Sequence, residues 1–222
     1  AKFAADATAV LDFLDANLAF IGPAQYVREP VLRICKDSDE FNMYHKGGVS
    51  GWSWGDEIVT WKNTGYAAFT TEDVTANCAQ HWMYERNKDV WNAMPTWLQR
   101  GLTEAFGKSR SKNGKLEFYN DSWERVDVAE QIRAGKFSTL KELMHLETEK
   151  LYADRNKISE CAAATRFLLT GPKKAKDALR AYLDALGPIV KKMREDRDKD
   201  LASGGAKKAT TQEEEEAQFK AA

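Results

Sequence analysis

The second half of the chain constrains the fold most, because it is rich in charged residues and its segments have a helical pattern. Glycine and proline interrupt this half at Gly135, Gly171-Pro172 and Gly187-Pro188. Residues of these two types commonly end or kink helices. Beyond Gly114 we therefore expect mostly helix, with separate helices over residues 125–134, 138–152, 157–169 and 173–194.

The first half mixes helical and extended segments. Apolar residues recur with a helical period between 4 and 19, and Val31 to Cys35 is a short apolar run typical of a strand. Asp37 is placed to cap a helical turn that follows it. Gly55-Asp56 has the composition of a hairpin turn, so we expect two paired strands over residues 49–54 and 57–61.

Two further helices are predicted in the middle of the chain. The first runs from about Val74 to Asn87, and the second covers residues 96–106. Pro95 suits the first position of the second helix, and Gly107 lies just past its end.

Together these segments predict an α+β fold, in which a small mixed sheet is followed by a helical C-terminal subdomain. We place a sheet-plus-helix subdomain at residues 1–115, a helical subdomain at 116–194 and a charged tail at 195–222. Ser203-Gly204-Gly205 predicts a flexible break in this tail, and Thr211 with Glu214 has the spacing of a capping box before a terminal helix.

Charge and cysteine content narrow the choice of partners. The 33 basic and 34 acidic residues leave a formal net charge of −1, which provides no overall field to attract nucleic acid or an anionic membrane. The basic run over residues 108–115 therefore reads as a solvated loop. No apolar run is long enough to span a bilayer. The three cysteines are odd in number and widely spaced, unlike a disulfide framework.

The start of the sequence leaves the cellular compartment open. The chain begins at Ala1, and no charged-then-apolar signal segment precedes the first helix. An exported protein whose leader has been removed and a trimmed chain both fit this start. In either case we expect a soluble protein.

Two short segments in the middle of the chain carry a family resemblance. Residues 76–81 read ANCAQH, and residues 94–106 read MPTWLQRGLTEAF. They resemble the peptidase-MA-like (gluzincin) zinc peptidases, in which H-E-x-x-H lies on one helix and P-x-W-L-x-E-G-L-A-E-Y/F on the next. The resemblance covers about residues 5–190. It implies a mixed sheet packed on the two former active-site helices.

The resemblance also implies which positions once held the metal. The first histidine falls on Asn77, the general base on Cys78, the second histidine on His81 and the carboxylate ligand on Arg100. Two histidines four residues apart bind one Zn²⁺ from the same helix face, and the glutamate accepts a proton from the metal-bound water. An asparagine amide is a poor zinc ligand. A cation about 4 Å from Zn²⁺ is repelled by roughly 8 kcal/mol at an effective dielectric of about 20. We therefore expect no zinc cofactor and no zinc-dependent hydrolysis.

Three interpretations of this region follow. In the first, Arg100 occupies the metal position and pairs with Glu104, and the chain acts as a protein-interaction or structural subunit of an assembly. In the second, Cys78 and His81, three residues apart on one helix, join Glu104 in a rearranged metal site of a hydrolase or peptidase. In the third, the old cleft still binds peptides without cutting them.

The resemblance further implies a strand that holds the substrate backbone by strand addition in the cleft. In this sequence that strand consists of Glu57, Ile58, Val59, Thr60 and Trp61. A peptide ligand would then lie beside this strand.

Overall fold

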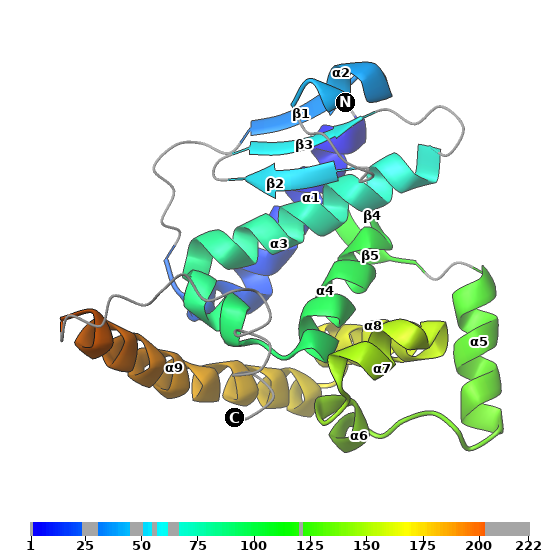
Figure 1. Ribbon diagram of the computed structural model, residues 1–222. Coiled ribbons are helices and arrows are strands. Elements are labelled where there is room, and N and C mark those ends of the chain that lie inside the picture. Colours follow the sequence, from blue (N-terminus) through cyan, green and yellow to red (C-terminus); the bar gives the residue numbers. More distant parts are fainter. Residues whose placement is uncertain are drawn as a thin grey trace.

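The structure is a computed structural model that describes residues 2–23, 31–44, 51–54, 57–61, 67–119 and 122–202. The fold is α+β with a helical C-terminal part, as predicted. In Figure 1, a small sheet lies on one side of the long helix α3, and the C-terminal helices lie on the other side.

The first helix ties the N-terminus to several later elements. Helix α1 (Lys2–Leu18) is followed by a 3-10 turn, η1 (Ala19–Ile21), and buries an apolar stripe that includes Val10 and Leu14. Its buried Asp6 carboxylate accepts a hydrogen bond of 2.7 Å from the Ser111 backbone N–H and another from Lys2.

Three strands form the main sheet. They are β1 (Val31–Cys35), β2 (Gly51–Trp54) and β3 (Glu57–Trp61), in the spatial order β1-β3-β2. Strand β3 runs antiparallel to β2, as the predicted hairpin requires, and parallel to β1. The hairpin turn at Gly55-Asp56 lies outside the described residues.

A short helix follows β1. In α2 (Ser38–Asn42), the Asp37 side chain caps the first turn by accepting from the Glu40 backbone N–H at 2.9 Å. This confirms the predicted cap. Phe41 of α2 packs with Cys35 and Val59 in a small buried cluster, which fixes α2 on the sheet.

The two helices of the family resemblance are α3 (Ala67–Ala93) and α4 (Thr96–Gly107). Helix α3 kinks at Asn87, where the prediction ended it, because Asn87 leaves the helical conformation and its side-chain oxygen accepts from the Val90 backbone N–H at 3.1 Å. The helix then resumes. Pro95 precedes α4 as its N-cap, one position earlier than predicted.

The basic run expected as a loop is a β-hairpin. Strands β4 (Ser109–Lys112) and β5 (Lys115–Phe118) pair across Asn113-Gly114, and both turn residues have positive φ. Asn-Gly is the typical sequence of such a turn, so this hairpin has a local sequence signal and the predicted loop is wrong. The Lys112 ammonium hydrogen-bonds Glu117 and lowers the pKa of that carboxyl, with help from Arg110.

Five helices complete the described part of the chain. They are α5 (Ser122–Arg133), α6 (Leu140–Met144), α7 (Thr148–Ala153), α8 (Arg155–Thr170) and α9 (Lys173–Ala202). The single helix predicted over 138–152 is therefore wrong, since it is divided into α6 and α7. Tertiary contacts override local propensity here. The Thr148 hydroxyl of α7 hydrogen-bonds Thr96 at the start of α4 at 2.9 Å, and Leu151 is fully buried.

Helix α9 is longer than predicted. It continues through Gly187-Pro188 to Ala202, so the expected start of the charged tail at residue 195 falls inside a helix. A proline removes one helical hydrogen bond, but the buried Leu186 and Val190 pack on both sides of it. Residues 191–200 are all exposed, and in Figure 1 this end of α9 runs out beyond the other helices. Residues 203–222 lie outside the described part.

One hydrophobic core joins the two expected subdomains. A single cluster of buried side chains includes Leu14 of α1, Val74 of α3, Leu98 of α4, Leu169 of α8 and Leu183 of α9. The expected boundary at residue 115 therefore does not divide the core. Among the residues described, no helix is both long and apolar enough to cross a membrane.

Candidate functional site

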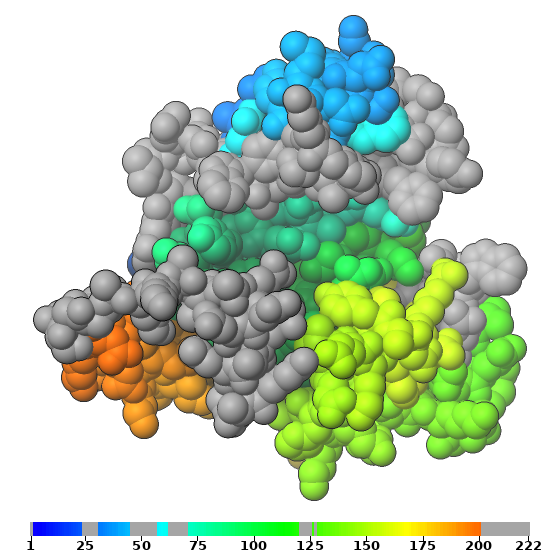
Figure 2. Space-filling view, in the orientation of Figure 1, coloured from blue at the N-terminus to red at the C-terminus, as the bar shows by residue number. Residues whose placement is uncertain are grey.

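The candidate site lies where α3 and α4 pack side by side. The Gln80 amide of α3 donates a hydrogen bond of 2.9 Å to the Thr103 hydroxyl of α4, and the Gln99 amide donates to the Trp91 carbonyl at 2.5 Å. Figure 2 shows α3 exposed between the α2 region and the α7–α8 region on one face of the molecule. The positions that carry the family resemblance therefore lie on two helices that hydrogen-bond to each other.

Helix α4 takes this position because its apolar residues recur on one side. Trp97, Leu98, Leu102 and Phe106 are buried, whereas Arg100 is only half-buried. Gly101 allows α4 to approach α8 closely, since a Cβ at this position would lie 2.1 Å from the Thr165 hydroxyl oxygen.

Asn77 is directed at its own helix. Its side-chain amide donates a hydrogen bond of 2.8 Å to the Asp73 carbonyl, one turn earlier in α3. This bond occupies the amide nitrogen within the helix. The half-buried Asn77 therefore has its amide oxygen, a poor zinc ligand, as its one possible metal donor.

Cys78 is buried with a protonated thiol. The side chain belongs to the main hydrophobic core, and burial raises the pKa of the Cys78 thiol to about 12. The thiolate is the form that binds metals and attacks electrophiles. At neutral pH Cys78 is therefore a packing residue. His81, one turn further along α3, is buried as well.

Arg100 and Glu104 form the ion pair expected from the sequence. The Arg100 Nη2 atom lies 2.5 Å from Glu104 Oε1, with the two residues one turn apart on α4. The Arg100 guanidinium also lies 5.7 Å from the ring centroid of Tyr152 on α7. The cation is therefore held by a carboxylate on one side and by an aromatic ring on the other.

These side chains do not fit a zinc ion. Of the four motif positions only His81 offers a good zinc donor, while Asn77 bonds its own helix and Arg100 brings a positive charge. The rearranged set fares no better, because the Cys78 thiol is protonated and the Glu104 carboxylate is paired with Arg100. Among the described residues, no three His, Cys, Asp or Glu side chains are grouped as metal ligands.

The predicted peptide-binding strand needs a correction. Strand β3 (Glu57–Trp61) is the central strand, paired with β1 on one edge and with β2 on the other. Strand addition requires an open edge, and β3 has none. Ile58, Val59 and Thr60 are buried, and Glu57 accepts a hydrogen bond of 2.7 Å from Arg33 of β1. The parallel pairing of β1 with β3 joins segments distant in sequence, so no local pattern revealed it.

Comparisons of the chain with protein-family models, with curated proteins and with solved structures gave no match.

Proposed function

We propose that this chain is a catalytically inactive metallopeptidase-like protein that acts by binding, as a protein-interaction or structural subunit of an assembly. The Arg100–Glu104 ion pair carries the proposal, because a fixed cation lies at the position where the resemblance expects a carboxylate ligand of zinc. The buried, protonated thiol at the position of the general base supports the same conclusion.

A restoration experiment tests the inactive-peptidase part of the proposal. The variant Asn77→His/Cys78→Glu/Arg100→Glu would rebuild the ligand set around His81 and supply a general base. We expect it to bind one zinc ion per chain, and a chelator to lower its melting temperature. Wild type should contain no stoichiometric zinc and should melt at the same temperature with and without chelator.

The matched control is Asn77→His/Cys78→Glu, which retains Arg100. It carries the same buried glutamate as the triple variant, so it separates any folding defect from the effect of the cation. We expect it to bind zinc far more weakly. A triple variant that is folded by circular dichroism but binds no zinc would refute the inherited site, and stoichiometric zinc in wild type would refute its loss.

A second experiment addresses binding. Tyr152 presents an exposed aromatic ring beside Arg100, and Phe167 of α8 presents a ring of similar exposure on another helix. If a partner binds at this site, Tyr152→Ala should weaken recovery of that partner with the tagged chain, and Phe167→Ala should not. Equal recovery with both variants would place the interaction elsewhere.

A further inference from the structure

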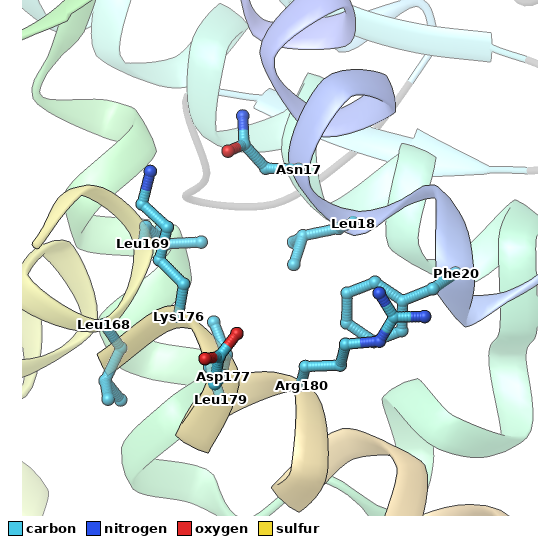
Figure 3. Close-up of a pocket in the computed structure, with 9 residues that line it drawn as sticks. All are labelled: Asn17, Leu18, Phe20, Leu168, Leu169, Lys176, Asp177, Leu179 and Arg180. Atoms are coloured by element: carbon cyan, nitrogen blue, oxygen red, sulfur yellow. The ribbon is translucent and has the colours of Figure 1, made fainter. Parts of the chain in front are cut away.

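A cavity of about 130 Å³ opens where the end of α1, the end of α8 and the start of α9 meet (Figure 3). Four leucines supply its apolar lining: Leu18, Leu168, Leu169 and Leu179. Each is at most 6% exposed, so the core fixes this lining. An apolar cavity of about 150 Å³ in a protein core is large enough for a benzene ring. This cavity is thus suited to a compact branched or cyclic apolar group.

Charged side chains from the first turns of α9 surround the cavity. Asp177 accepts a hydrogen bond of 2.8 Å from Lys173, which neutralises it, and the Arg180 guanidinium lies 4.7 Å from the ring centroid of Phe20. Within the described part of the chain, the Lys176 ammonium has no hydrogen-bond or ion-pair partner. Figure 3 shows this ammonium on the opposite side of the cavity from Arg180.

A second cavity on the same face of α9 provides an internal comparison. It measures about 120 Å³ and shares Phe20 with the first cavity as a lining residue. Val90 and Leu183 are among its other apolar lining residues. Its one charged lining residue, Asp184, is paired with Arg180 at 3.8 Å. Of the charged residues that line the first cavity, Asp177 is paired with Lys173 and Arg180 with Asp184, which leaves Lys176 as the unpaired charge among the described residues. Two cavities of similar size therefore differ in that, among the described lining residues, the first has an unpaired cation and the second has none.

We propose that the first cavity binds a small carboxylic acid with a compact apolar tail. The carboxylate lies at Lys176, and the apolar group enters among the four leucines. Removing that group from water supplies the affinity, and the unpaired ammonium supplies the preference for an anion. The carboxylate comes from a free acid or from the C-terminal residue of a peptide, since the two share this chemistry. None of the candidate site residues lines this cavity.

Methyl-detected NMR titration tests the proposal directly. With 4-methylpentanoate, we expect the methyl signals of Leu168, Leu169 and Leu179 to shift, while those of Val90 and Leu183 in the second cavity stay unchanged. The isosteric neutral 4-methylpentanamide should bind about fivefold more weakly, which is the effect of one partly exposed ion pair. Equal affinity for the acid and the amide, or shifts confined to the second cavity, would overturn the proposal.

A pair of lysine variants tests whether the Lys176 ammonium attracts the carboxylate. Lys176→Met should weaken the binding of 4-methylpentanoate about fivefold and should leave the binding of the amide unchanged. Lys174→Met is the matched control, because Lys174 is exposed on α9 and does not line the cavity. The affinity of Lys174→Met for 4-methylpentanoate should equal that of wild type. An equal effect of the two substitutions would show that general surface charge, not Lys176, attracts the acid.

A third ligand distinguishes a free acid from a peptide C-terminus as the source of the carboxylate. N-acetyl-glycyl-leucine has the same branched tail and a carboxylate at a chain end. Tighter binding than 4-methylpentanoate would assign the cavity to peptide C-termini, and weaker binding would assign it to free acids. Absence of leucine methyl shifts with either ligand at millimolar concentration would refute the site.

Discussion

Helices α4 and α8 pack against each other, and each carries an ion pair within one helical turn, but the two pairs lie in different surroundings. The side chains of Arg100 and Glu104 on α4 are 33% and 23% exposed. On α8, Glu160 is 0% exposed and Lys157 is 24% exposed. Solvent screens the first pair and hardly reaches the carboxylate of the second.

The buried pair also belongs to a hydrogen-bond network. Glu160 accepts from Lys157 at 3.1 Å and from the Ser138 backbone N–H at 3.2 Å, and Lys157 donates to the Ser138 hydroxyl at 2.7 Å. This network fixes the segment before α6 onto α8. The pair on α8 is therefore explained by folding, whereas stability alone explains little of the pair on α4.

The largest expected effect comes from removing the cation of the buried pair. Lys157→Met leaves the fully buried Glu160 carboxylate without its partner, which costs about 3–5 kcal/mol of unfolding free energy. The melting temperature should fall by roughly 10 °C. Urea denaturation and calorimetry measure both quantities.

The control is Lys157→Met/Glu160→Gln. A neutral glutamine still accepts from the Ser138 N–H, so the double variant should regain most of the lost stability. A loss below about 1 kcal/mol in the single variant would remove the contrast between the two pairs.

The next effect concerns the contact that holds α4 and α8 together. A Cβ at Gly101 would lie 2.1 Å from Thr165 Oγ1 and 2.6 Å from the Cys161 carbonyl oxygen. Gly101→Ala must push the two helices apart, and it should cost about 1–3 kcal/mol. Gly107→Ala in the same helix is the control, because its nearest atom is at 3.7 Å, an ordinary contact. Similar stability of the two variants would show that the helices are not closely packed.

Two buried thiols, one on α3 and one on α8, should make the unfolding free energy depend on pH. Burial raises the pKa of Cys78 on α3 to about 12, and burial with the neighbouring Glu160 charge raises the pKa of Cys161 on α8 to about 12. The unfolded thiols titrate near 9.0. Because the folded pKa lies above the unfolded one, this contribution is complete below pH ~9 and is lost as the pH rises toward ~12.

Between pH 8 and pH 10, each thiol should therefore account for about 1.4 kcal/mol of lost unfolding free energy. Cys78→Ala and Cys161→Ala should each make the decrease between these two pH values smaller by that amount. Urea denaturation at both pH values measures it. An unchanged pH dependence in either variant would mean that water reaches that thiol in the folded state.

The local parts of this picture were predictable from sequence. The bounds of α4 follow from its apolar spacing, and the Arg100–Glu104 pair follows from a four-residue separation in a helix. The β2–β3 hairpin is local in the same sense. The Asn113-Gly114 hairpin also had a local signal, but its flanking charges suggested a loop.

The remaining features depend on contacts between distant segments. Strand β3 is central only because β1, more than twenty residues earlier, pairs with it in parallel, and this pairing removed the predicted peptide-binding edge. The break between α6 and α7 contains no glycine or proline, so packing of Leu151 and Thr148 decides it. The pocket beside α9 likewise needs three helices to meet.

The smallest expected effect is the loss of Arg100 itself. Arg100→Ala removes a solvent-screened pair and a contact with Tyr152, so the unfolding free energy should fall by only about 0.5 kcal/mol. A double-mutant cycle with Glu104→Ala should give a coupling of about 0.3–0.5 kcal/mol. If the loss instead exceeds about 2 kcal/mol, Arg100 is a structural residue like Lys157. A small loss, together with weaker partner binding, would assign Arg100 to recognition, because a cation that contributes little to folding would then be required at the site.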